Sequence, residues 1–261
     1  MNKSVTLEVC VDSIESALAA ERGGADRIEL CSALIDGGVT PSYGLIAAVR
    51  ESVRIAVHVM IRPRGSDFCY SDDEFKIMQR DITVAKQVRA EGVVIGLLDV
   101  DGQVDVARTR ELVAFAAPLK VTFHRAFDMS SDPLKALHDL QGTGVHYILT
   151  SGGKQSAIDG MDTLRRIVRA AGDQIRIIAA AGILEDNVRQ LIEQTGVREI
   201  HASAKCAVDS VMRFRNEGIS MGALPGQEYH RFVAQQEKIQ RLLLAASARE
   251  LKSELPRAGK R

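Results

Sequence analysis

Short apolar runs alternate with longer amphipathic segments from one end of the chain to the other. The runs are rich in Val, Ile and Leu, and several show the period-two alternation of apolar and polar residues that indicates a β-strand. The segments between them, such as residues 71–92 and 105–118, are amphipathic, as expected of helices packed on a sheet. The pattern predicts eight strands, at residues 6–11, 27–32, 56–61, 92–98, 120–125, 146–151, 176–182 and 198–204.

This alternation of strands and helices predicts an α/β protein folded as a closed (β/α)8 barrel, the TIM barrel. The intervals between strands are long enough for the helical crossovers that parallel strands need. An open doubly wound sheet is the alternative, but such sheets usually carry a glycine-rich phosphate-binding turn after the first strand. The turn here, VDSIES at residues 11–16, has no glycine. Asp12 or Ser13 should cap the first helix, which should stop at Gly23 or Gly24.

A further helix is predicted after the eighth unit, from about Glu228 to Leu251. We expect it to form a C-terminal helical extension that packs on the barrel or on another subunit. The expected organisation is therefore one domain over residues 1–251 and a flexible tail over residues 252–261. The apolar stripe of this helix consists of Phe232, Ile239, Leu242 and Leu243.

Composition narrows the range of partners. The 261 residues suit one barrel, which typically takes about 250 residues. Balanced charge, 34 basic against 34 acidic residues, argues against nucleic acid or an anionic membrane surface as the main partner. No apolar window reaches the roughly 18 residues that span a bilayer. The four cysteines are scattered rather than arranged as a disulfide framework, so we expect a cytoplasmic protein with free thiols.

Polar residues gather on the strand faces that should point into the barrel. Glu8 and Cys10 share one face of the first strand, and Glu29 and Cys31 share one face of the second. A purely structural interior is filled mainly by bulky branched side chains, and unpaired buried charges are costly. The pattern therefore predicts a polar site inside the barrel. The other residues assigned to this inner face are His58, Met60, Arg62, Thr122, His124, Thr150, His201 and Ser203.

Two interpretations of the inward charges remain open at this point. In the structural one, Glu8 and Glu29 form a buried network with Arg62 and Arg125. In the catalytic one, a histidine acts as general acid or base, a glutamate orients it or acts as base, and Arg62 binds an anionic group. The candidate catalytic residues are Glu8, Glu29, His58, Arg62, His124 and His201.

Loops after the later strands are candidates for binding a cofactor or a phosphate. In many α/β barrels the loops that follow the seventh and eighth strands bind phosphate through backbone N–H groups. The glycines in these loops could equally be simple turn residues. The candidate residues in the loops after the sixth, seventh and eighth strands are Ser151, Gly152, Gly153, Gly182 and Ser203.

Several longer motifs make the chain resemble a known family. They include LEVCVDSIESALAAERGGADRIELCSAL, GGVTPSYGLI, VHVMIRPRGSDF, VTFHRAFD, ILTSGG, VREIHASA and MRFRNEGISMG, which together cover about residues 5–222 in order. With these motifs the chain resembles the CutC family, which is associated with copper homeostasis. Ser66 departs from the pattern, which usually has a second glycine there.

The resemblance implies a TIM barrel, a cytosolic homo-oligomer (dimer or tetramer), and Cu(I) held by Cys10 and Cys31 of the LEVC and IELC motifs. Thiolates suit Cu(I), because it is a soft ion, and Met60 could add a thioether. Copper leaves the inward histidines, Arg62 and the glutamates unexplained. The alternative function is a lyase, isomerase or hydrolase that acts on a small anionic or phosphorylated metabolite at the C-terminal mouth of the barrel. The expected partner is thus a copper ion or such a metabolite.

Overall fold

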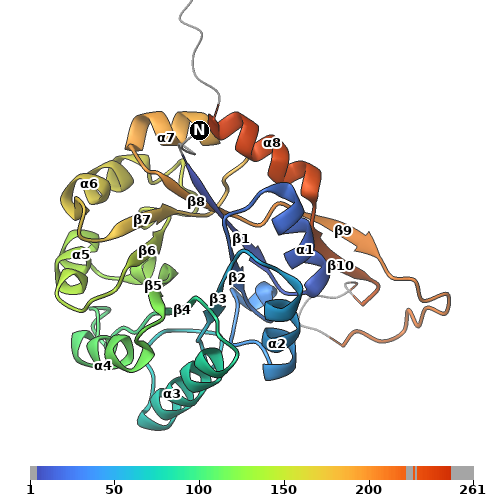
Figure 1. Cartoon of the computed structure of the whole chain (residues 1–261), viewed down its shortest axis with the longest axis horizontal. Helices are drawn as coiled ribbons and strands as arrows, with labels where there is room; N and C mark the ends of the chain where they lie inside the picture. The colour runs from blue at the N-terminus through green and yellow to red at the C-terminus, as the bar shows by residue number, and fades with distance from the viewer. Residues whose placement is uncertain (1–4, 222–225, 227, 248–261) are drawn as a thin grey trace, which may run out of the picture.

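Eight parallel strands close into a barrel in a computed structural model that describes residues 5–221, 226 and 228–247. The first strand pairs with both the second and the eighth, which closes the sheet and confirms the predicted (β/α)8 fold (Figure 1). The barrel strands are β1 (Thr6–Val11), β2 (Arg27–Leu30), β3 (Ala56–Met60), β4 (Gly92–Ile95), β5 (Lys120–Phe123), β6 (Tyr147–Thr150), β7 (Arg176–Ala179) and β8 (Glu199–Ala202).

Helices surround the barrel as an outer ring (Figure 1). Two short 3-10 helices, η1 (Leu34–Asp36) and η2 (Arg125–Met129), follow β2 and β5. No helix in the described part of the chain combines the length and the apolar character needed to cross a membrane. The α-helices are α1 (Ile14–Gly23), α2 (Tyr43–Ser52), α3 (Asp72–Gln87), α4 (Val106–Ala116), α5 (Pro133–Gln141), α6 (Met161–Ala171), α7 (Val188–Thr195) and α8 (Gln236–Ser247).

Local sequence sets where these helices begin and end. The Ser13 hydroxyl accepts a hydrogen bond from the Ser16 amide at the start of α1, and Gly24 ends that helix in the left-handed conformation, as predicted. Helix α3 begins with a capping box in which Ser71 and Glu74 each accept from the other's backbone N–H. These caps fix the ends of the helices that cover the strands.

The two faces of the strands differ as the alternation predicted. In β1, Leu7, Val9 and Val11 are buried in the apolar layer between barrel and helices, whereas Glu8 lies on the inner face. Parallel neighbours in register share a face, and Cys10 pairs with Glu29, which in turn pairs with His58. The inner face of the first three strands therefore carries carboxylate, thiol and imidazole groups at neighbouring positions.

The prediction for β6 was wrong by one residue. Tyr147 and Leu149 face the interior, where Leu149 packs with Ile178 and Ala180, and Thr150 faces outward. The Thr150 hydroxyl instead donates a hydrogen bond to Asp128. Apolar residues occupy both faces of this strand, so alternation alone could not fix its orientation.

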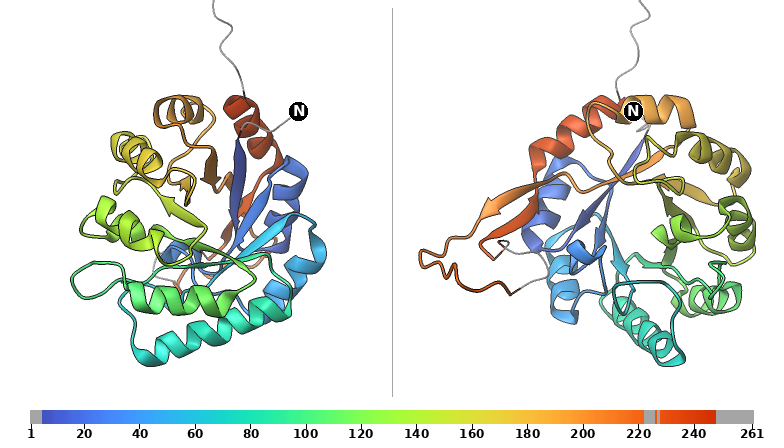
Figure 2. Two further views of the ribbon diagram at one scale, coloured as in Figure 1. Left: turned by 60° about the vertical axis from the view of Figure 1, so that its left-hand side comes forward. Right: turned by 180° about the vertical axis from the view of Figure 1, so that it is seen from behind.

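The C-terminal extension is a helix preceded by a strand. Residues 205–209 and 230–234 form an antiparallel pair, β9 (Lys205–Asp209) and β10 (His230–Ala234), on an arm that projects from the barrel (Figure 2). The predicted helix therefore begins only at Gln236, and Phe232 lies in β10 rather than in a helical stripe. Helix α8 packs between α1 and α7 (Figure 1). The predicted tail at 252–261 lies outside the described residues.

Candidate functional site

A cavity of about 1070 Å³ opens at the end of the barrel where the strands finish and the βα loops begin. Catalytic sites of barrel enzymes lie at this end. Its walls include residues from most of the strands and from the long loop after β3. Glu8, Cys31 and His58 are buried behind the cavity wall. The predicted site residues that line the cavity are Cys10, Glu29, Arg62, His124, Gly182, His201 and Ser203.

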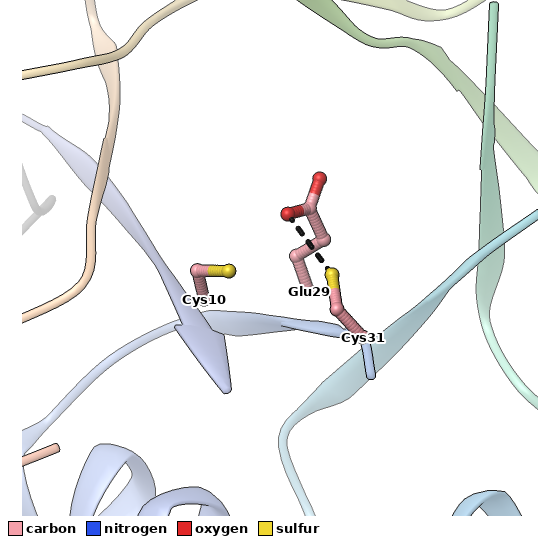
Figure 3. Close-up of side chains that lie close together, drawn as sticks. All are labelled: Cys10, Glu29 and Cys31. Atoms are coloured by element: carbon pink, nitrogen blue, oxygen red, sulfur yellow. Dashed lines mark hydrogen bonds between the residues drawn. The ribbon is translucent and has the colours of Figure 1, made fainter. Parts of the chain in front are cut away.

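Cys10, Glu29 and Cys31 form a compact group at the ends of β1 and β2 (Figure 3). Their ligand atoms, two thiol sulfurs and one carboxylate oxygen, all lie within 4.8 Å of one another. The Cys31 thiol donates to Glu29 Oε2 over 3.5 Å. Cys31 and Met60 also pack in one buried cluster that Cys10 contacts, so three sulfur-containing side chains meet on this side of the interior.

A buried network of ion pairs lies beside the group formed by Cys10, Glu29 and Cys31. His201 Nδ1 lies 2.7 Å from Glu8 Oε1, and the other Glu8 oxygen accepts from Arg27 Nε. The Nη2 atom of Arg27 donates to Glu199 Oε2 over 3.0 Å. Through His201 Nε2, which is 3.9 Å from Glu29 Oε2, the network reaches the thiol group. The network thus fixes the orientation of the His201 ring beside the cysteines.

This network differs from the one considered from sequence. Arg27 and Glu199 are the partners of Glu8 and His201, whereas Arg62 and Arg125 pair with neither Glu8 nor Glu29 in the described chain. Arg27 stands two residues before Glu29, and Glu199 stands two residues before His201. The same period-two rule that selected Glu29 and His201 would therefore have placed both missed residues on the inner face.

Burial, hydrogen bonds and nearby charges shift the pKa values of Cys10 and Cys31 in opposite directions. A hydrogen bond from Cys31 outweighs the effect of burial and, with His201, lowers the pKa of Cys10 to about 5. Hydrogen bonding to Cys10 and burial raise the pKa of Cys31 well above its ordinary value. Burial, together with the charges of Cys10 and Glu8, raises the pKa of Glu29 to about 8. These opposite shifts make Cys10 the more acidic of the two thiols.

The ion pairs also set the charge of Glu8 and His201. Burial opposes ionisation of Glu8, but Arg27 and His201 outweigh it and hold the Glu8 pKa well below its usual range. Burial likewise opposes protonation of His201, and the nearby Glu29, Cys10 and Glu8 outweigh it, so the His201 pKa is raised. Glu8 is therefore a buried carboxylate that lies between two cations, Arg27 and His201, and His201 is an imidazolium paired with Glu8.

Arg62 and His124 lie in the same mouth but outside this network. Arg62 is 5% exposed, and its terminal nitrogens donate to the carbonyls of Asp36, Gly38 and Ser66. His124 caps η2, because its Nδ1 accepts from the Ala126 amide. Arg62 thus connects the loops after β2 and β3, and His124 holds the start of the 3-10 helix after β5.

His58 lies deeper, against the backbone of β4. A Cβ at Gly92 would meet the His58 ring at 2.6 Å, so only glycine leaves room for the ring there. The His58 Nδ1 is 3.5 Å from the Thr122 hydroxyl, and the ring lies against Tyr147. Burial, partly offset by Glu8, lowers the pKa of His58 to about 4. His58 is therefore a neutral core side chain at neutral pH.

We expect His58→Asn to change how stability depends on pH. Between pH 6.5 and 4 the unfolded chain binds a proton at His58 that the folded wild type does not. Wild type therefore loses this contribution as the pH falls through that window, by up to about 1.4 kcal/mol per pH unit, and the asparagine variant does not. Urea denaturation at several pH values should show the gap between the two proteins narrowing on acidification. A gap of constant size would contradict the buried neutral histidine.

The backbone amides of the predicted phosphate-binding loop after β6 already donate hydrogen bonds to other groups of the protein. The Asp128 carboxylate accepts from the amides of Ser151 and Gly153, and Gly152 donates its amide to the Thr150 hydroxyl. Ser151, Gly152 and Gly153 are not among the residues that line the mouth cavity. A carboxylate of the chain thus occupies the position that a bound phosphate would take.

Comparisons with known proteins agree on one family. The model of the CutC family matches residues 5–206. A human protein named copper homeostasis protein cutC homolog is 48% identical over 237 residues, covering 90% of this chain and 87% of that protein. A Salmonella agona protein named family protein CutC is 47% identical and covers 87% of this chain and 91% of its own length. The crystal structure of CutC from Streptococcus agalactiae superposes with a TM-score of 0.73 at 30% identity, covering 76% of this chain and 98% of that one.

Proposed function

Because this chain belongs to the CutC family of copper homeostasis proteins, we propose that it binds Cu(I) through the thiols of Cys10 and Cys31. The observation that carries the proposal is the approach of two cysteine sulfurs within 4.8 Å of each other at the mouth of the barrel. Cu(I) is a soft ion that prefers thiolate and thioether ligands. The low pKa of Cys10, about 5, supplies the thiolate without a further base.

The surroundings of the two thiols suit a low coordination number. Met60 packs against Cys31 and offers a thioether as a third ligand. The backbone at Gly38 covers the other side of Cys31, where an added Cβ would lie 3.1 Å from its sulfur. Cys10 lines the cavity and Cys31 is buried behind it, so an ion would reach Cys31 past Cys10. Binding would deprotonate Cys31, with the His201 imidazolium compensating the added negative charge.

A cytoplasmic location fits this chemistry, since the cytosol keeps thiols reduced and available to the metal. We also propose a homo-oligomer, for which the exposed apolar side chains of the projecting arm are the candidate contact. Exposed apolar residues on this arm include Val211, Phe214, Ile219 and Met221.

Titration with Cu(I) against a chromophoric chelator tests the site. Wild type should bind one equivalent of Cu(I) tightly. Cys10→Ser and Cys31→Ser should each weaken binding by more than about 100-fold, because loss of a group that only hydrogen-bonds to a metal ligand already lowers metal affinity by about 10- to 100-fold. Cys206→Ser, a cysteine on β9 that does not line the cavity, is the matched control and should bind as wild type does. Equal, weak affinity in wild type and the double Cys10→Ser/Cys31→Ser variant would refute the proposal.

A further inference from the structure

Arg62 is a buried cation that has no counter-ion within the described part of the chain. Among the described residues, no carboxylate lies within 4.0 Å of its guanidinium, which donates to three uncharged backbone carbonyls and lies close to the uncharged Tyr70 side chain. Its Nε–H has no hydrogen-bond partner within the described chain. An unpaired buried charge and an unmade hydrogen bond are both costly, so this side chain has an unused capacity to bind an anion.

His124 contributes a second free donor. Its Nδ1 accepts from the Ala126 amide, so the neutral ring carries its proton on Nε2. Burial and the charge of Arg62 lower the pKa of His124 to about 3, which keeps the ring neutral at physiological pH. The buried Nε2 has no partner in the described chain. His124 is thus fixed as a neutral donor in the same cavity wall as Arg62.

Arg62 and His124 are neighbours that pack on the same aromatic ring. The ring of Phe68 lies 5.0 Å from the His124 ring and 5.0 Å from the Arg62 guanidinium carbon, and the charge of Arg62 is close enough to act on His124. All three residues line the mouth cavity. Gly96 supports the arrangement from behind, because a Cβ there would lie 2.3 Å from the His124 ring.

The donor set indicates the class of ligand. Two N–H groups and one positive charge match the two oxygens and single charge of a carboxylate. A phosphate would need more donors, and the amides of the loop after β6 that could supply them already donate to Asp128. Apolar side chains line the same cavity, among them Leu98, Leu149 and Leu184.

We propose that Arg62 and His124 form a binding subsite for the carboxylate of a small metabolite with a short aliphatic part. The subsite uses none of the sulfur ligands proposed for copper, so it stands or falls independently of the copper site. It assigns a role to Arg62 and His124, which the proposed Cu(I) site does not use.

Binding of butyrate to the metal-free protein tests the subsite. With histidine labelled by 15N, the Nε2 resonance of His124 should shift saturably on addition of butyrate, and butyramide, the uncharged analogue, should give no saturable shift. His124→Asn keeps an acceptor for the Ala126 amide but lacks the Nε2 donor. We expect it to bind butyrate about tenfold or more weakly by calorimetry, since a hydrogen bond to a charged group contributes at least this factor. His138→Asn, on the exposed face of α5, is the matched control and should bind as wild type does.

The proposal would be overturned by the absence of a saturable His124 shift with butyrate, by equal affinity for butyramide, or by tighter binding of inorganic phosphate than of butyrate. Because Arg62 also anchors loop carbonyls, Arg62→Met could disturb the fold, so the decisive variant is His124→Asn, with its folding checked by circular dichroism. Wild-type affinity in that variant would also overturn the subsite.

Discussion

Replacing Arg27 with methionine is expected to lower the free energy of unfolding by about 3–5 kcal/mol, the usual cost of removing one partner of a buried ion pair. Arg27 lies between Glu8 and Glu199, and all three side chains are nearly inaccessible to solvent. Methionine fills similar space but leaves two buried carboxylates with much less compensation. The midpoint of urea denaturation, read together with its slope, measures the loss.

A surface pair provides the matched control for this substitution. Arg241 on α8 lies 2.7 Å from Glu185, and both side chains are about half exposed. Arg241→Met should therefore change stability by less than about 1 kcal/mol, as is usual for exposed ion pairs. Adding Glu8→Gln to the Arg27→Met variant should recover part of the loss, because it removes one uncompensated charge. If Arg27→Met costs no more than Arg241→Met, the network does not stabilise the barrel.

The second large effect is expected at Gly160, the residue before α6. A Cβ on Gly160 would lie 1.8 Å from the carbonyl oxygen of Ser151, which is backbone and cannot move aside as a side-chain tip could. Gly160→Ala should therefore destabilise the protein by about 3 kcal/mol or more, at the upper end of overpacking effects. Thermal denaturation followed by circular dichroism gives the measurement.

Gly44→Ala is the control for Gly160→Ala. No heavy atom lies within 4 Å of a Cβ built on Gly44, and the residue is in helix α2. Alanine should therefore stabilise the protein by up to about 1 kcal/mol through its greater helix propensity. Opposite signs for the same chemical change would show that the close approach of two backbone segments, and not alanine itself, causes the loss. Wild-type stability in Gly160→Ala would contradict this packing.

Much of the architecture could be predicted because its causes are local. Each barrel strand is a short apolar run, helices α1–α7 each have a side-chain cap or a glycine at one end, and the βα order is repeated, so the barrel follows from the order. Period-two alternation also placed Glu8, Cys10, Glu29 and His201 together on the inner face. Alternation failed at Thr150, because apolar residues on both faces of β6 leave its orientation to the packing of Leu149 against β7.

The pairing of these groups could not be predicted, because it depends on distances between residues far apart in sequence. Arg27 could be assigned to the inner face, but only the closed barrel brings it to Glu8 and Glu199. Similarly, the sequence placed glycines after β6, and only the fold shows that Asp128 uses their amides.

By itself, the sequence determined the (β/α)8 order, the polar inner face and the family to which the chain belongs. The tertiary structure alone decided which polar groups are paired and which are left free. Pairing satisfies Glu8 and His201, whereas Arg62 Nε and His124 Nε2 remain unpaired within the described chain. The physical reason is that charge and hydrogen-bond compensation act over a few ångströms in space, whereas sequence patterns report only which way a side chain faces.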